Sequence, residues 1–372
     1  MIIKNGNIHV GNGKVLNGYD ILIEGKIIKK IDKNIERDSE IIIDGGGKEI
    51  FPGFIDPGTS LGSMDISFSI KDHNERSNPI MPEAQIKYSF NHREIELEEL
   101  YKVGISTIGA SPGNDNIIGG QMAAYKTWGK NSETMLVKEP VGLKASVINN
   151  VKELYGKRNQ LPMTKMAIFS KLEEFLKGNL DLNDNGKKIL NNVLKRETPL
   201  FIAANTEMEI NSVINIINKF NIKLVLVGAY QGDRCIENII DSKASLVLGE
   251  QIYLTEKNYN ETDLIKFSEL KQNNIPISYS LSGKYGPSGK VKYLWNAIEF
   301  LKAGMSSEEI VEMMTLNPSK ILGIDDILGS IEKGKNADIV IYTKNPIEYY
   351  DAQLTNTIIN GEMAYSKEGF KC

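Results

Sequence analysis

The chain has 372 residues, of which 41% are hydrophobic and 25% are charged, so it can bury a large core and is not an intrinsically disordered protein. Its formal net charge is −4 at pH 7, and its Lys and Arg residues are spread along the sequence, which argues against a surface that binds nucleic acid. No apolar run reaches the length of about 18 residues that crosses a bilayer, so we expect no membrane-spanning helix.

The N-terminal segment predicts short β-strands. Asn5-Gly6 lies between two short strand-like segments, and because Asn and Gly accept positive φ angles, the pair predicts a two-residue hairpin turn. Gly25 separates two further segments, 19–24 and 26–32, and predicts a second hairpin. Residues 41–43 add one more short apolar strand.

The middle of the chain alternates between strand-like and helix-like segments. Several of the strands are continuous apolar runs, such as 224–227, which is typical of strands buried on both faces. Ser306 and Glu309 form a capping box that predicts the start of a helix. This alternation predicts an α/β fold, a (β/α)₈ TIM barrel. The predicted barrel strands cover residues 50–56, 104–110, 121–127, 135–144, 199–205, 223–230, 244–251 and 275–282.

Short strands return at the C-terminal end, at 337–342, 357–360 and 363–365, with Asn360-Gly361 as the turn between the last two. We therefore expect a small sheet assembled from both ends of the chain, which would hold the chain ends together.

The sequence also favours a cytoplasmic location. The first ten residues lack the charged and apolar regions of a signal peptide. The two cysteines, Cys235 and Cys372, are far apart and do not indicate a disulfide framework.

Four passages carry a family resemblance when taken in order. They are Phe51-Pro52-Gly53-Phe54-Ile55-Asp56, then Asp72–Pro79 with Asn116–Gln121, then Thr315–Gly323, and finally Gly329–Val340. Together these passages resemble the metal-dependent amidohydrolase superfamily, nearest the imidazolonepropionase-like amidohydrolases. The resemblance implies a TIM barrel at 51–324 with a composite β-sandwich domain at 1–50 plus 325–372. It also implies hydrolysis of an amide or ring C–N bond by metal-activated water, in a protein that is commonly a homodimer.

The resemblance implies metal ligands that this sequence lacks. The family has a His-x-His pair after its first barrel strand, histidines at the fifth and sixth strands, and an aspartate at the eighth. The matching positions here are Gly58, Ser60, Ala203, Asn205, Gly228 and Ser282. Glycine and alanine offer no donor, and a serine hydroxyl is a poor zinc ligand. We therefore expect no zinc or other divalent metal bound in the family's manner.

Other residues could still serve a pocket at the barrel mouth. The chain has three histidines, and we interpret His9, His73 and His92 as ordinary surface or loop residues, although His73 follows the first barrel strand. Carboxylates at strand ends could hold a hard cation, but pairing with Lys or helix dipoles is the simpler interpretation. The remaining pocket candidates are His73, Glu139, Lys144, Tyr230, Glu250 and Lys284.

Three hypotheses stay open at this point. The first is a degenerate, non-catalytic relative that binds a small ligand in the barrel mouth. The second is an active hydrolase of non-peptide C–N bonds, in cyclic amides or dipeptide-like substrates, with altered machinery. The third is a structural or scaffold subunit. Pocket volume, metal content and turnover would discriminate among them.

Overall fold

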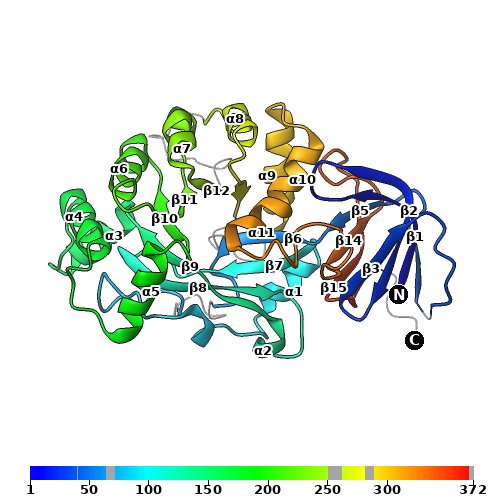
Figure 1. Cartoon of the computed structure of the whole chain (residues 1–372), viewed down its shortest axis with the longest axis horizontal. Coiled ribbons are helices and arrows are strands. Elements are labelled where there is room, and N and C mark those ends of the chain that lie inside the picture. The colour runs from blue at the N-terminus through cyan, green and yellow to red at the C-terminus, as the bar shows by residue number, and fades with distance from the viewer. Residues whose placement is uncertain (40, 64–71, 250–261, 281–288, 368–372) are drawn as a thin grey trace.

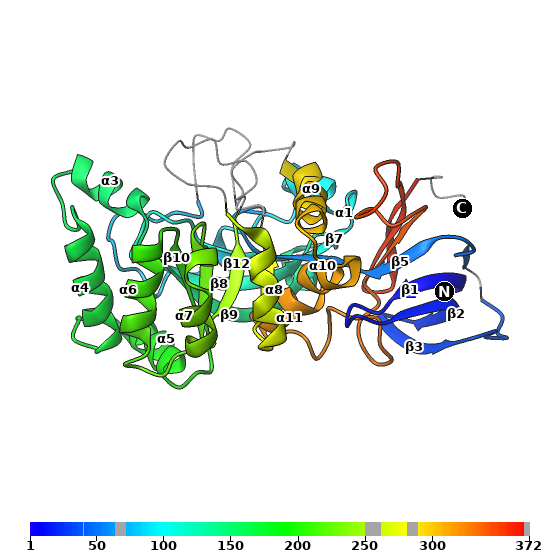
Figure 2. The same cartoon turned by 90° about the horizontal axis from the view of Figure 1, so that it is seen from above.

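A computed structural model describes residues 1–39, 41–63, 72–249, 262–280 and 289–367. Two eight-stranded sheets organise these residues. Figures 1 and 2 show the sheet that contains both chain ends beside a larger barrel-like sheet, along the long axis of the molecule. Among the described residues, no helix has the length and apolar character needed to cross a membrane.

The smaller sheet, here called the terminal sheet, has the strand order β16-β15-β14-β5-β1-β2-β3, and β4 also pairs with β1. Its strands are β1 (Ile2–His9), β2 (Val15–Glu24), β3 (Ile27–Asp32), β4 (Ile42–Asp44), β5 (Glu49–Pro52), β14 (Ile339–Tyr342), β15 (Leu354–Ile359) and β16 (Glu362–Ser366). Strands from both ends of the chain therefore share one hydrogen-bonded sheet. The second layer of a sandwich and the division at residues 50 and 325 stay predictions.

The predicted turn at Asn5-Gly6 is wrong, because β1 runs through it as one strand. Asn5 does adopt a positive φ of 54°, but the conformation produces an irregularity in the β1–β2 pairing between Ile3 and Gly6. The Asn5 N–H donates to the Asp20 carboxylate at 2.8 Å, which satisfies the group at the irregularity. The prediction of a turn at Gly25, between β2 and β3, is confirmed.

The barrel sheet has the order β13-β12-β11-β10-β9-β8-β7-β6. Its strands are β6 (Phe54–Thr59), β7 (Ile105–Ala110), β8 (Ile118–Lys126), β9 (Leu136–Ser146), β10 (Leu200–Ala204), β11 (Leu224–Gly228), β12 (Ser245–Leu248) and β13 (Ile277–Tyr279). The predicted strand 50–56 is thus two strands, with β5 in one sheet and β6 in the other. Gly53 joins them because a Cβ there would overlap the Ser106 hydroxyl.

Eight successive β/α units are not present, because β8 runs antiparallel to both neighbours. A parallel neighbour needs a crossover of a dozen or more residues. The connection from Ala110 to Ile118 is too short for that, and the connection from β8 to β9 holds only the single-turn helix α2 (Ser132–Met135). The other neighbouring strand pairs of this sheet are parallel, so the fold is TIM-barrel-like with one reversed strand.

Helices cover the outside of the barrel sheet (Figure 1). They are α1 (Ile95–Tyr101), α3 (Asn149–Lys157), α4 (Lys165–Leu176), α5 (Asp184–Leu194), α6 (Glu207–Ile217), α7 (Ile236–Ser242), α8 (Ser268–Gln272), α9 (Gly289–Lys302) and α10 (Ser307–Met314). The next helix, α11 (Leu316–Leu322), packs instead against one end of the barrel. The predicted capping box at Ser306 and Glu309 is confirmed as the start of α10.

Side chains from the end of the edge strand β13 and from α9 bond to the other edge strand, β6. The Ser280 hydroxyl donates to the carbonyl of Gly58 at 2.9 Å, and the Tyr293 hydroxyl donates to the carbonyl of Ile55 at 2.8 Å. At the N-terminal ends of the strands, Ile321 and Leu322 of α11 pack into the interior apolar cluster of the barrel. That end is therefore filled, and the opposite end, where the parallel strands finish, is the mouth.

Candidate functional site

The mouth is where a barrel of this type places its functional groups, because the strands deliver side chains there from several directions. Gly58 lies on the inner wall at this end. A Cβ added to it would contact Val247 Cγ1 at 3.9 Å and Ser280 Oγ at 3.8 Å, which is ordinary van der Waals contact. The wall therefore has room for a side chain at position 58, and the sequence does not supply one.

Two more of the predicted positions lie against each other. Gly228 has a φ of +86°, and a Cβ on it would overlap the side-chain oxygen of Asn205. Asn205 follows β10 directly, and its N–H donates to the Glu209 carboxylate at 2.8 Å, which fixes the start of α6. A ligating side chain at position 228 would therefore clash with its neighbour and strain the backbone.

The remaining strand-end candidates are placed as follows. Ser60 is largely buried just after β6, and Ala203 is buried within β10. Tyr230 follows β11, and its ring atoms would lie 3.2 Å from a Cβ on Gly249. Ser282, Glu250 and Lys284 lie outside the described residues.

These donors do not fit the zinc ion that the family resemblance implies. Zinc sites use imidazole, thiolate and carboxylate groups, whereas Gly58, Ala203 and Gly228 have no side-chain donor and Ser60 and Asn205 carry neutral oxygens. In the part of the chain that the structure describes, no three His, Cys, Asp or Glu residues are grouped to hold a metal. We therefore derive no chemistry through a metal at these positions.

Two loop motifs from the sequence, Asp72–Pro79 and Asn116–Gln121, meet beside the mouth. The His73 carbonyl accepts the Gly113 N–H at 3.0 Å, and the Pro79 carbonyl accepts the Ile118 N–H at 3.1 Å. An ion pair joins Arg76 to Asp115, with Nη2 and Oδ2 2.6 Å apart. The Tyr155 hydroxyl donates to Asn116 Oδ1 at 2.7 Å. The two motifs therefore build one wall of the site together.

The interpretation of the histidines as surface or loop residues is wrong for His9, which is buried in β1, whereas His73 lies in a loop but is not at the surface. His73 is buried, and its Nδ1 lies 3.4 Å from the carbonyl oxygen of Ser63. His9 is also buried and contacts two carboxylates, Glu49 and Glu308. Tertiary contacts over 40 and 299 positions satisfy this imidazole, and hydrophobic patterning does not reveal such distant partners. His92 is half-buried near Ser132.

Lys144 is a lysine buried near the mouth. It lies near the end of β9, paired in register with Phe201 on one side and Gly120 on the other, and only 4% of it is exposed. Its amine donates to Asn114 Oδ1 at 2.6 Å and to the carbonyl of Ala145 at 3.2 Å. Both acceptors are uncharged. Burial alone lowers the pKa of Lys144 to about 7.

The chain is similar in sequence to known amidohydrolases. The amidohydrolase family model matches residues 196–364. The imidazolonepropionase of Picrophilus torridus is 25% identical over 97% of both chains, and that of Bacillus cereus is 22% identical over 98% of this chain and 90% of its own. Together these similarities support the amidohydrolase superfamily for this chain.

A solved structure agrees at the level of the fold. An amidohydrolase from Thermotoga maritima superposes with a TM-score of 0.90 at 24% identity, and the match covers 98% of this chain and 100% of the other. The barrel-like sheet with its accompanying terminal sheet is therefore an arrangement that this relative shares.

A second buried lysine in this fold, Lys126, differs from Lys144 because it has a carboxylate partner. Lys126, at the end of β8, contacts the Asp338 carboxylate, with Nζ and Oδ2 2.6 Å apart. Because β8 is reversed, this pair lies at the filled end of the barrel and ties it to the segment that enters β14. Burial lowers the pKa of Lys126, and the Asp338 carboxylate opposes that effect. Sequence patterning does not indicate this pair, because its partners are 212 positions apart.

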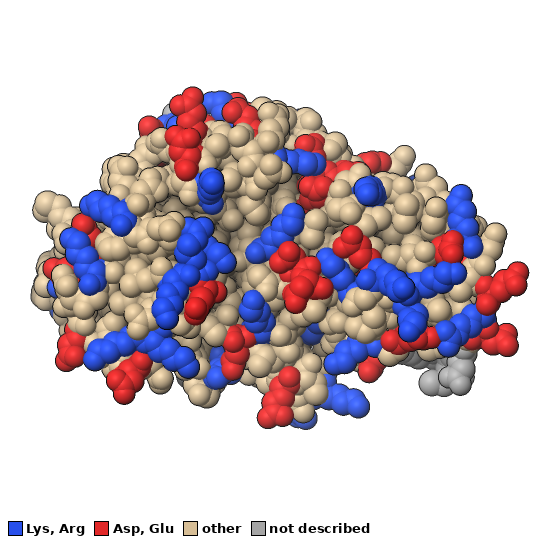
Figure 3. All heavy atoms as spheres, viewed as in Figure 1, with Lys and Arg blue, Asp and Glu red and all other residues tan. Residues whose placement is uncertain are grey.

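Glu139 lies in the first half of β9, away from the mouth, and its carboxylate contacts Lys87 Nζ at 2.8 Å. At the same filled end of the barrel, a hollow of about 180 Å³ collects several cations. They are Lys138, Arg196, Lys223, Lys243 and Lys320. Figure 3 shows Lys and Arg side chains around this hollow. Several of them lie at helix C-termini, where cations are favoured by the helix dipole, so we assign the hollow no ligand.

Cys235 is buried at the start of α7. Burial raises the pKa of its thiol to about 11. The thiolate that nucleophilic catalysis requires is therefore scarce at neutral pH.

Proposed function

We propose that this amidohydrolase-superfamily protein binds a small polar molecule at the barrel mouth without the zinc of its relatives, and that Lys144 is the centre of the binding site. One observation carries the proposal. A buried amine faces uncharged acceptors at the strand ends, where the positions matching the family's metal ligands include Gly58, Ala203 and Gly228, which have no side-chain donor.

The chemistry of the site favours a ligand with an oxygen acceptor. A buried ammonium without a counter-ion is costly, and among the described residues the partners of Lys144 are the Asn114 amide oxygen and one backbone carbonyl. A carboxylate or carbonyl oxygen from a ligand would improve on these partners. Asn205 follows β10, which pairs with β9, and Ser280 follows the edge strand β13; both carry neutral polar groups. We therefore propose a small carboxylate, cyclic amide or oxo acid as ligand.

The test combines elemental analysis with a thermal-shift screen of small carboxylic acids, cyclic amides and 2-oxo acids. Binding at a hundredfold excess over Kd stabilises a protein by about 2.7 kcal/mol, which a thermal shift detects. The ligand-induced shift should disappear in Lys144→Met and persist in Lys171→Met, a matched substitution on the outer surface. A shift that is unchanged in Lys144→Met, or one equivalent of zinc in the purified protein, would overturn the proposal.

A second candidate is an active hydrolase of non-peptide C–N bonds with altered machinery. The named imidazolonepropionases among the relatives favour it, as does an amine whose pKa of about 7 suits proton transfer at neutral pH. Turnover of cyclic amides or dipeptides by the purified protein, with kcat lost in Lys144→Met and rising with pH around 7, would support it. Absence of turnover across such a panel would reject it.

Three further expectations belong to the proposal. We propose that residues 1–50 and 325–372 form one composite domain beside the barrel at 51–324, that the protein forms a homodimer, and that it works in the cytoplasm. Light scattering on the purified protein tests the dimer, and a monomer would remove the oligomeric part. A scaffold role would be favoured instead if no ligand of the panel binds.

A further inference from the structure

We propose that Lys144 holds a small aldehyde or ketone covalently, as an imine between its Nζ and the carbonyl carbon of the ligand. This inference rests on the proposed function, because it takes the mouth to be the ligand site.

The position of Lys144 suits such a role. Its neighbour across the β9–β10 pair is Phe201, which belongs to the apolar cluster of the barrel interior. Gly142, two residues earlier on the same strand, faces Phe201 and Met122, so the same side of β9 faces the interior. Lys144 therefore faces the barrel interior beside this apolar layer, near the mouth end of β9, and is almost fully buried.

The hydrogen bonds of the Lys144 amine do not involve its lone pair, which is the group that would react. A neutral primary amine has two N–H bonds and one lone pair. Asn114 Oδ1 and the Ala145 carbonyl are both acceptors, and together they take two N–H bonds. Neither group can donate to the lone pair. The pKa of about 7 means that roughly half of the amine is neutral at pH 7, whereas an exposed lysine is almost fully protonated.

Formation of the imine requires no reactant besides the amine and the carbonyl compound. The lone pair of Nζ attacks the carbonyl carbon, the C=O π electrons move to oxygen, and a proton passes from nitrogen to that oxygen to give a carbinolamine. The carbinolamine then loses its hydroxyl group and a proton from nitrogen as one water molecule, which leaves the C=N bond. The step needs no oxidant or reductant, and water reverses it.

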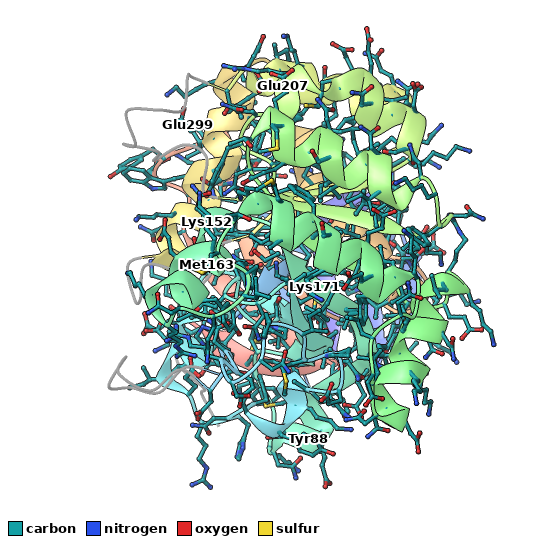
Figure 4. All side chains as sticks on the ribbon, turned by 90° about the vertical axis from the view of Figure 1, so that its left-hand side faces the viewer. Tyr88, Lys152, Met163, Lys171, Glu207 and Glu299 are labelled. Carbon is teal, nitrogen blue, oxygen red and sulfur yellow. The ribbon has the colours of Figure 1, made fainter. Side chains whose placement is uncertain are left out.

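Lys126 is an internal comparison for this inference. It is as deeply buried as Lys144, but its Nζ lies 2.6 Å from the Asp338 carboxylate. An ammonium held by a carboxylate has no lone pair to offer. Lys171 is the comparison for an accessible lysine, because it lies on the outer face of α4 with its Nζ 2.7 Å from a carboxylate oxygen of Glu174 (Figure 4).

The experiment is reductive trapping in the full chain. The protein is treated with propanal or pyruvate and sodium cyanoborohydride at pH 7, and peptide mass spectrometry measures the alkylation rate of each lysine. The neutral fractions implied by a pKa of about 7 and the ordinary lysine value of about 10.4 differ by roughly a thousandfold. Solvent access offsets part of this, so we expect Lys144 to react at least about a hundredfold faster than an exposed lysine such as Lys171. Lys126 should also react more slowly than Lys144, because its ammonium is buried against the Asp338 carboxylate. Equal or slower alkylation of Lys144 would overturn the proposal.

An isosteric variant separates reactivity from simple accessibility. Asn114→Asp keeps the shape of the side chain but places a carboxylate beside Nζ, which favours the ammonium. We expect trapping at Lys144 to fall at least about tenfold at pH 7 and to recover at higher pH. An unchanged rate would contradict the assigned role of the neutral amine.

The outcomes also separate this inference from the function on which it rests. If trapping fails while thermal shifts by carboxylic acids still depend on Lys144, the imine is rejected and non-covalent binding stands. If neither depends on Lys144, both are rejected. Trapping specific to Lys144 with both aldehyde and oxo acid supports the imine.

Discussion

The contact of His9 with two carboxylates should make the stability of this protein depend on pH. His9 is the last residue of β1, and its ring stacks on Phe51 with the centroids 4.2 Å apart. Its Nδ1 lies 2.5 Å from Glu308 in α10, and its Nε2 lies 2.9 Å from Glu49 in β5. The imidazole thus connects the terminal sheet to a helix of the barrel. We expect His9→Gln, which keeps a polar side chain, to remove the pH dependence.

The magnitude follows from the pKa. Burial lowers the pKa of His9, but the hydrogen bonds to Glu308 and Glu49 and their charges outweigh burial and raise it to about 9. The unfolded value is about 6.5, so at about 1.36 kcal/mol per unit the charged imidazole contributes about 3 kcal/mol. Because the folded pKa is raised, this stability is fully present below pH 6.5 and is lost as the pH rises through 9.

The assay is urea unfolding of the wild type and His9→Gln between pH 6 and 10. Lys144 titrates with the opposite sign, since its folded pKa is lowered and stability from it rises with pH. That contribution is common to both proteins, so the difference between them isolates His9. The difference should be about 3 kcal/mol at pH 6 and near zero at pH 10. A difference that does not change with pH would refute the assignment of the raised pKa to these two carboxylates.

Three further substitutions test the described contacts by thermal and urea denaturation. Asp338→Asn leaves Lys126 buried without its counter-ion and should cost about 3 to 5 kcal/mol, whereas adding Lys126→Met should restore most of the loss; a cost below about 1 kcal/mol would mean that water reaches the pair. Gly228→Ala should cost about 1 to 3 kcal/mol because of the positive φ, and adding Asn205→Ala should recover only the part due to the clash with Asn205. Full recovery would mean that the cost comes from that clash and not from the backbone conformation. Tyr293→Phe removes the hydrogen bond from α9 to Ile55 of β6 and should cost about 1 kcal/mol, and an unchanged urea midpoint would show that this bond does not stabilise the fold.

The sequence predicted what local patterning encodes. The continuous apolar runs at 224–227 and 246–248 became β11 and β12, buried in the barrel wall, and the capping box at Ser306 began a helix. The direction of β8 was not predictable in the same way. Alternation of side chains has the same period whichever way a strand runs, and only the short connections on both sides of β8 reveal its reversal.

The candidate site could likewise be predicted only in part from the sequence. The missing ligands at Gly58 and Gly228 could be recognised from the sequence, because the residue type alone shows that a glycine has no ligating side chain. The difference between Lys144 and Lys126 could not. Both are lysines within apolar strands, and only folding brings Asp338 to one of them and the neutral Asn114 to the other.

The terminal sheet has a consequence for the order of events during synthesis. Its central strand β5 ends at Pro52, and the strand that pairs with its far side, β14, begins only at Ile339. While the ribosome makes the whole barrel, one edge of β5 has no partner, and unpaired strand edges of partly made chains invite aggregation. The barrel must therefore be nearly complete before the first strands made can finish their own sheet, so chaperone dependence should be greatest for nascent chains halted shortly before residue 339.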